Sequence, residues 1–141
     1  MKTFMSRAVL AGLVLSASMM ASAATQAPEK ATVFIVAPEN GATVSKTFKV
    51  KFGVTDVALA PAGDQTAHTG HHHLLIDAKE VIPAGVVIPA DANHVHFGKA
   101  QTETELTLTP GTHTLQLELG DKNHMAFEPP IVSKKITVTV K

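Results

Sequence analysis

The sequence contains no cysteine, no tryptophan and no tyrosine. Without cysteine the chain forms no disulfide, no thiolate metal site and no covalent haem attachment through a CxxCH motif. The missing tryptophan and tyrosine also argue against an aromatic platform that binds sugars. The one arginine is Arg7, so an arginine-containing basic patch is absent and we expect no nucleic-acid partner.

A hydrophobic run long enough for a membrane anchor is missing as well. A positive start containing Lys2 precedes an apolar run over residues 8–20 and small residues that end at Ala23. The run is shorter than the about 20 residues that a spanning helix needs. We predict a signal peptide over residues 1–23 with cleavage between Ala23 and Ala24. A periplasmic protein without stable membrane insertion after cleavage would result.

Beyond a polar leader over residues 24–31, apolar and polar residues alternate with a period of two, which is typical of half-buried strands. No stretch there has a helical period, and Asn-Gly and Pro-Gly pairs mark turns between the runs. Strands are expected over residues 32–37, 47–54, 72–77, 93–97, 104–109, 112–119 and 134–140. The pattern predicts an all-β fold, an immunoglobulin-like antiparallel β-sandwich of about seven strands over residues 32–141.

Histidine is the one residue type whose distribution points to chemistry. All eight histidines lie within residues 68–124. Two His-x-His pairs occur, at His71/His73 and His94/His96, and residues two apart in a strand point to the same side. Each pair could therefore present two imidazoles to one metal ion. The candidate metal ligands are His68, His71, His73, His94, His96 and His124.

Strand order predicts that these six histidines meet at one end of the sandwich. If the strands alternate up and down, the connections after the second, fourth and sixth strands fall at the same end. His113 follows a turn at the other end, and we interpret it as a structural, partly buried histidine. His72 is in phase with Leu74, so it is interpreted as the start of the core face.

An imidazole-only ligand set suits Cu(II), Zn(II) or Ni(II). The favoured hypothesis is a periplasmic protein that binds copper or zinc for storage, delivery or buffering. An alternative is a non-catalytic interaction module of the cell envelope, whose histidines are structural or sense pH near 6.5. A histidine-metal enzyme is less favoured because no nucleophile motif or paired-carboxylate motif is evident. The metal ion is the one partner that the sequence suggests, and no protein partner can be assigned.

Three strings carry a family resemblance: GHHHLLID at residues 70–77, HVHFGKAQTE at 94–103 and PGTHTLQL at 110–117. Together they resemble a family of small exported bacterial domains of unknown function. The resemblance covers roughly residues 32–140. It implies a periplasmic β-sandwich in which these histidine strings recur, and it implies no ligand or reaction.

Overall fold

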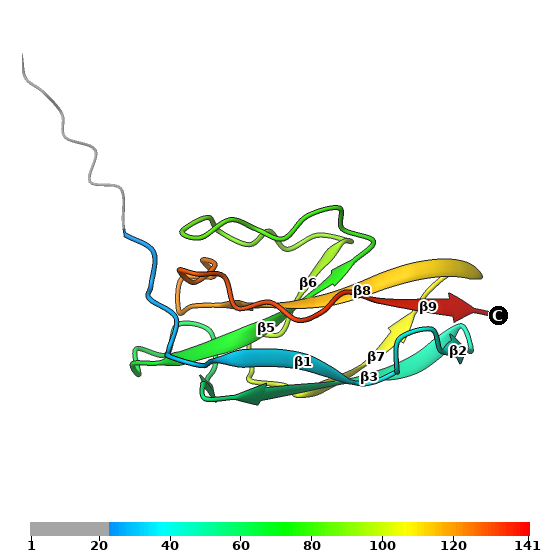
Figure 1. Ribbon diagram of the computed structural model, residues 1–141, viewed down its shortest axis with the longest axis horizontal. Helices are drawn as coiled ribbons and strands as arrows, with labels where there is room; N and C mark the ends of the chain where they lie inside the picture. The colour runs from blue at the N-terminus through cyan, green and yellow to red at the C-terminus, as the bar shows by residue number, and fades with distance from the viewer. Residues whose placement is uncertain (1–22) are drawn as a thin grey trace, which may run out of the picture.

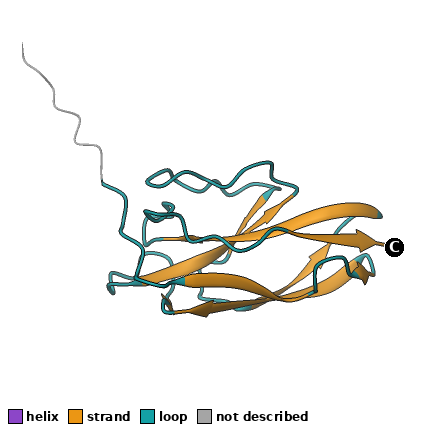
Figure 2. Ribbon diagram, in the orientation of Figure 1, coloured by secondary structure: helices purple, strands orange, loops and turns teal. Residues whose placement is uncertain are grey.

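The computed structural model describes residues 23–141, so the predicted signal peptide lies outside the described residues except for Ala23. All regular secondary structure in these described residues is β-strand (Figures 1 and 2). The strands are β1 (Thr32–Ala37), β2 (Thr43–Val44), β3 (Thr47–Thr55), β4 (Ala58–Leu59), β5 (Thr69–Ile76), β6 (His94–His96), β7 (Glu103–Thr107), β8 (Gly111–Gly120) and β9 (Ile136–Val140). Residues 23–141 thus contain no helix that could cross a membrane.

The smaller sheet has the order β1-β3-β7 with antiparallel pairing throughout. Its central strand, β3, shows the predicted alternation. Phe48, Val50 and Phe52 are buried, while Lys49 and Lys51 between them are exposed. This sheet therefore has one apolar face and one solvated face, as the period of two requires.

The larger sheet has the order β2-β9-β8-β5-β4, and β6 adds to it by pairing with β5. The β5–β8 pairing is antiparallel and runs from His71 opposite Gly120 to Ile76 opposite Leu115. β5 begins at Thr69, three residues before the start that the sequence predicted. The three consecutive histidines therefore all lie within a strand rather than partly in a loop.

The two sheets pack face to face around one core. Val50 and Phe52 of β3 meet Leu74 of β5 and Leu117 of β8, and Phe127 from the loop after β8 is fully buried with them. Burying one such side chain contributes roughly 1.5–3 kcal/mol. Two sheets packed in this way form the immunoglobulin-like β-sandwich that the sequence predicted (Figure 1). The pairing is antiparallel except for the short parallel pairs β2–β9 and β4–β5 in the larger sheet.

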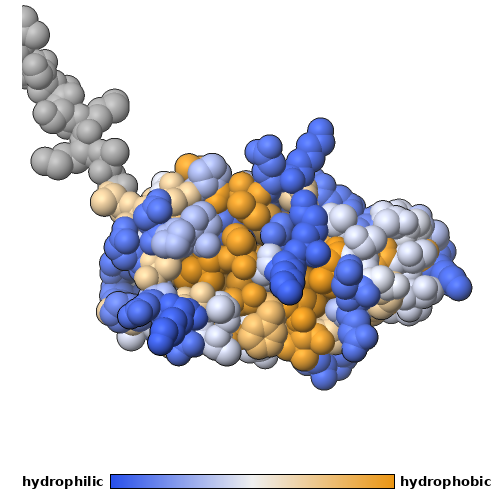
Figure 3. Space-filling model, viewed as in Figure 1, coloured by the Kyte–Doolittle hydropathy of each residue, from blue (hydrophilic) through white to orange (hydrophobic). Residues whose placement is uncertain are grey.

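Two surface regions differ in polarity. Figure 3 shows apolar side chains gathered in the middle of the viewed face, where β1 and the segment before β9 border a shared hollow. Phe34 and Val132 in this hollow are 41% and 36% exposed.

On the outer face of the larger sheet, the long loop between β5 and β6 covers the strands. Its Ile82 amide donates to the Glu118 carboxylate of β8 over 2.9 Å. His71, His73 and His96 lie on this covered face.

Candidate metal centre

The alternation of side chains along β5 divides its three consecutive histidines between two faces. His72 points into the core, where its ring centroid lies 4.9 Å from that of Phe52. His71 and His73 point the opposite way, onto the outer face of the larger sheet. His96 of β6 is the direct cross-strand partner of His73, so its side chain lies on the same outer face.

Four histidines meet on this outer face. His71 and His73 come from β5, His96 from β6, and His124 from the loop after β8. One ring nitrogen from each lies within 4.8 Å of the others. Nε2 of His71 is 3.2 Å from Nδ1 of His124. Two nitrogens that share a tetrahedral zinc ion with bonds near 2.0–2.1 Å lie about 3.3 Å apart. The cluster therefore has dimensions that could hold one metal ion.

A tight loop presents the fourth histidine. His124 adopts a left-handed conformation with φ of 62°, and its amide donates to the Asp121 carbonyl over 2.8 Å. The buried Asp121 carboxylate accepts from the amides of Asn123 and Met125 at 2.8 and 2.9 Å. Asp121 is thus buried, and its carboxylate holds the loop in shape.

Two further segments brace the same loop. The amide of Ile88 donates to the His124 carbonyl over 2.7 Å, so the β5–β6 loop pairs with it. The Thr25 hydroxyl donates to Asp121 Oδ2 over 2.6 Å, and the Ala27 amide donates to the Glu128 carbonyl over 2.9 Å. Residues of the predicted polar leader therefore lie against the domain and help to position His124.

Burial lowers the pKa of three histidines of the cluster, His71, His73 and His96. Desolvation is the main cause that lowers the pKa of His71 to about 4 and that of His73 to about 3, with further lowering by neighbouring imidazoles. The pKa of His96 is lowered by the same causes. A neutral imidazole is the form that binds a metal ion. These rings therefore stay in the metal-binding form down to a lower pH than free histidine does.

Glu118 is a buried acid that sequence reasoning missed. It is the cross-strand partner of His73 and is fully buried, and desolvation raises its pKa to about 7. Its Oε2 accepts from the Ile82 amide, whereas its Oε1 has no hydrogen-bond partner among the described residues. In the sequence Glu118 stands between Leu117 and Leu119. This alternation is typical of a strand whose polar face is solvated, so no local pattern predicts the burial of Glu118.

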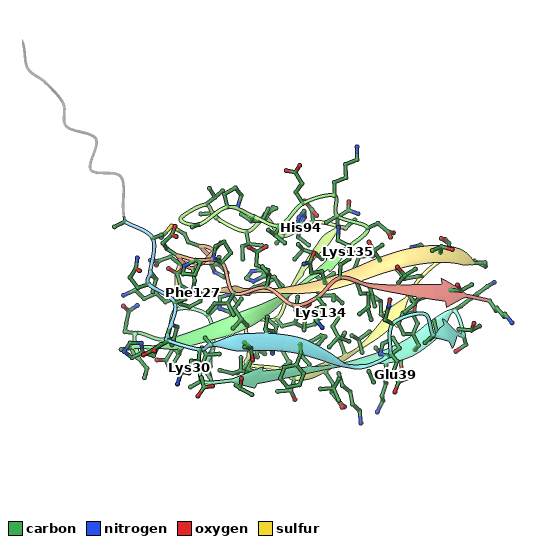
Figure 4. The ribbon with its side chains drawn as sticks, in the orientation of Figure 1. Lys30, Glu39, His94, Phe127, Lys134 and Lys135 are labelled. Atoms are coloured by element: carbon green, nitrogen blue, oxygen red, sulfur yellow. The ribbon has the colours of Figure 1, made fainter. Side chains whose placement is uncertain are left out.

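Two of the six candidate ligands lie outside the cluster. His94 also points to the outer face, but it lies two residue pairs further along β6, opposite Leu75. Its Nδ1 contacts Asp91 Oδ1 at 2.8 Å, beside the loop that precedes β6 (Figure 4). His68 is exposed just before β5. The structure therefore brings together four of the six histidines that the sequence predicted to converge, and the β5–β6 register separates His94 from them.

His113 lies at the opposite end and is partly buried, as predicted. Its Nδ1 is 2.7 Å from Asp77 Oδ2, and its Nε2 is 2.8 Å from the Thr109 carbonyl oxygen. The hydrogen bond with Asp77 is the main cause that raises the pKa of His113. This histidine is a structural link between β8 and the residue that follows β5.

The fold and the cluster define a small β-sandwich domain with a candidate four-imidazole centre on one sheet face. The chain belongs to the family described as Domain of unknown function (DUF4399), which matches residues 50–141. The resemblance seen in the sequence to a family of unknown function is thereby confirmed. No curated protein matches the chain.

The solved structures that are similar to the chain include the following two. One is the endo-beta-1,4-mannanase from Thermotoga petrophila, with 15% identity and a TM-score of 0.45 over 79% of this chain and 20% of that one. The other comprises fibronectin(III)-like modules of CbhA from Clostridium thermocellum, with 18% identity and a TM-score of 0.39 over 78% and 96%. The chain spans about one fifth of the mannanase. Neither similarity bears on the function of this chain.

Proposed function

We propose that this protein binds one transition-metal ion, copper or zinc, through His71, His73, His96 and His124. The observation that carries the proposal is the convergence of one ring nitrogen from each histidine within 4.8 Å. Imidazole nitrogens gathered at one point could all bind a single shared cation, because the neutral ring is the form that binds a metal ion.

The donor chemistry narrows the class of ion. Four neutral nitrogens and no thiolate suit Zn(II) or Cu(II) better than Mg(II) or Ca(II), which prefer oxygen ligands. Three ligands lie on paired strands and the fourth on a braced loop, so a loaded ion would sit in a largely preformed frame. This arrangement supports binding, storage or delivery of an ion.

The place of action belongs to the same proposal. The pattern of residues 1–23 supports export with cleavage after Ala23, which would bring the domain to the periplasm. A cysteine-free site suits that compartment, because imidazole ligands cannot be lost to disulfide formation. We therefore infer a role in periplasmic storage, delivery or buffering of copper or zinc.

Metal titration tests the proposal. Protein purified without a histidine tag is titrated with Zn(II) and with Cu(II) by calorimetry. We expect one ion per chain, and we expect the double variant His71→Ala/His73→Ala to lose this binding. The matched control is His68→Ala/His94→Ala, which removes the same number of imidazoles from outside the cluster and should bind as the wild type does. Equal losses in both double variants would contradict the proposal.

A further inference from the structure

Two imidazoles of the cluster rest directly on glycine residues. Gly120 ends β8, and a Cβ atom there would lie 2.6 Å from Cε1 and 3.1 Å from Nδ1 of His73. Gly98 follows β6, and a Cβ atom there would fall on the ring of His96, 2.9 Å from Nε2. Real Cβ atoms essentially never approach another heavy atom within 3.0 Å. Any side chain at either position would therefore displace the ring.

Backbone conformation gives no other reason for these two glycines. Neither is among the glycines with positive φ, which are Gly41, Gly63, Gly85 and Gly111. Glycine loses more backbone freedom on folding than alanine does, so it is unfavourable where its special conformations are not used. A glycine inside a strand often marks a point where another group approaches the backbone closely. Here the approaching group is an imidazole.

We propose that Gly98 and Gly120 are positioning residues of the metal centre. Each lets a ligand ring settle against the backbone, so that the nitrogens of His73 and His96 reach the common centre with His71 and His124. The proposal rests on the proposed metal-binding function. Two residues without functional groups thereby help to determine the geometry of the site.

The remaining contacts of these glycines would change little on substitution. A Cβ atom at Gly120 would lie 3.4 Å from the Cα atom of His124, and one at Gly98 would lie 3.4 Å from the Cβ atom of Ala62. Both are at the edge of ordinary van der Waals distances. The effect of an alanine should therefore fall on the ligand rings. Displacing an oriented ligand typically costs 10–100-fold in metal affinity.

Gly53 of β3 offers a matched control. A Cβ atom there would collide with the ring of Phe34, so Gly53→Ala creates the same kind of glycine–ring clash in the other sheet. Phe34 is 41% exposed and carries no metal ligand atom. Gly53→Ala should therefore lower the stability of the metal-free protein without affecting the metal centre.

The experiment measures Zn(II) affinity by competition with a chromophoric chelator, and coordination by the visible spectrum of bound Co(II). Gly98→Ala and Gly120→Ala should each weaken Zn(II) binding by about 10–100-fold and alter the Co(II) spectrum. Gly53→Ala should leave the affinity within about twofold of wild type, because its clash lies outside the site. Wild-type affinity and spectrum in Gly98→Ala and Gly120→Ala would overturn the proposal.

A double-mutant cycle separates this proposal from the proposed function. In the metal-free protein, Gly120→Ala should lower the free energy of unfolding when His73 is present. In the His73→Ala background it should leave that free energy unchanged or raise it, because the clash is gone and alanine loses less backbone freedom than glycine. An equal loss in both backgrounds would overturn the glycine–ring contact, whatever the metal affinity. A wild-type protein that binds neither Zn(II) nor Cu(II) would instead overturn the proposed function, and the result of the cycle would be unaffected.

Discussion

Replacing His72 by leucine should stabilise the protein and leave metal binding intact. The side chain is fully buried on the core face of β5, and neither ring nitrogen has a hydrogen-bond partner among the described residues. An unsatisfied buried polar group costs about 1–3 kcal/mol. Leucine has a similar volume and no polar atom, so near pH 7.5 we expect a gain of about 1–3 kcal/mol in the free energy of unfolding.

The gain should increase in acid. Burial lowers the pKa of His72 from 6.5 to about 4, so the unfolded chain takes up a proton in a range where the folded protein does not. Stability is therefore lost as the pH falls from 6.5 towards 4, and leucine removes this loss. From these two pKa values the additional gain is about 2 kcal/mol near pH 5.

Urea denaturation of the metal-free protein, near pH 7.5 and near pH 5, measures both effects. The variant keeps every other histidine, so the difference between wild type and variant reports on His72. Zn(II) affinity of His72→Leu should stay within about twofold of wild type, because the ring lies on the face opposite the cluster. A destabilised variant, a pH-independent difference or a lost metal site would each refute the assignment of His72 to the core.

Three further predictions follow from the site and its supports. His96→Ala should weaken Zn(II) binding at least tenfold by calorimetry, whereas His94→Ala should leave it unchanged; the reverse order would contradict the described cluster. The raised pKa of His113 means that its ion pair with Asp77 stabilises the fold fully below pH 6.5 and loses this effect as the pH rises through the folded pKa. Asp77→Asn should therefore cost more stability near pH 5.5 than near pH 8.5 in urea denaturation, and an equal cost would argue against the pair. Thr25→Val removes a hydroxyl donor to the loop that carries the fourth ligand. We expect a few-fold loss of Zn(II) affinity with little change in the free energy of unfolding. Wild-type affinity would show that the leader does not help to position His124.

Local patterns were enough to predict most of the fold. The alternation of β3 predicts its first residue, its inner face and its end to within one residue, because a strand with one face in the core must alternate. β5 is harder to predict, since a strand that is buried on both faces shows no polar alternation. The sequence pattern therefore predicts a loop before His72, although β5 already begins at Thr69.

The candidate site was predicted in part. His71 and His73 share a face for a reason that sequence spacing contains. The exclusion of His94 depends on the β5–β6 register, which places His96 opposite His73 and His94 opposite Leu75. No local pattern contains this register, because it depends on pairing between distant segments.

The burial of Glu118 also depends on distant segments. The loop between β5 and β6 folds over the outer face of β8, and its Ile82 amide binds the carboxylate. A residue between two leucines in a strand is expected to face solvent, and only the path of that loop reverses the expectation. The room that Gly98 and Gly120 leave for two rings is likewise visible only in three dimensions.

Long-range ¹H–¹⁵N spectra of the histidine rings test the central claim most directly. The spectra are recorded for protein without a tag, before and after one equivalent of Zn(II). We expect one ring nitrogen in each of His71, His73, His96 and His124 to shift to the metal-bound range at that single equivalent. The signals of His68, His94 and His113 should stay in place. Shifts of His68 or His94, or no shift within the four-histidine cluster, would contradict the account.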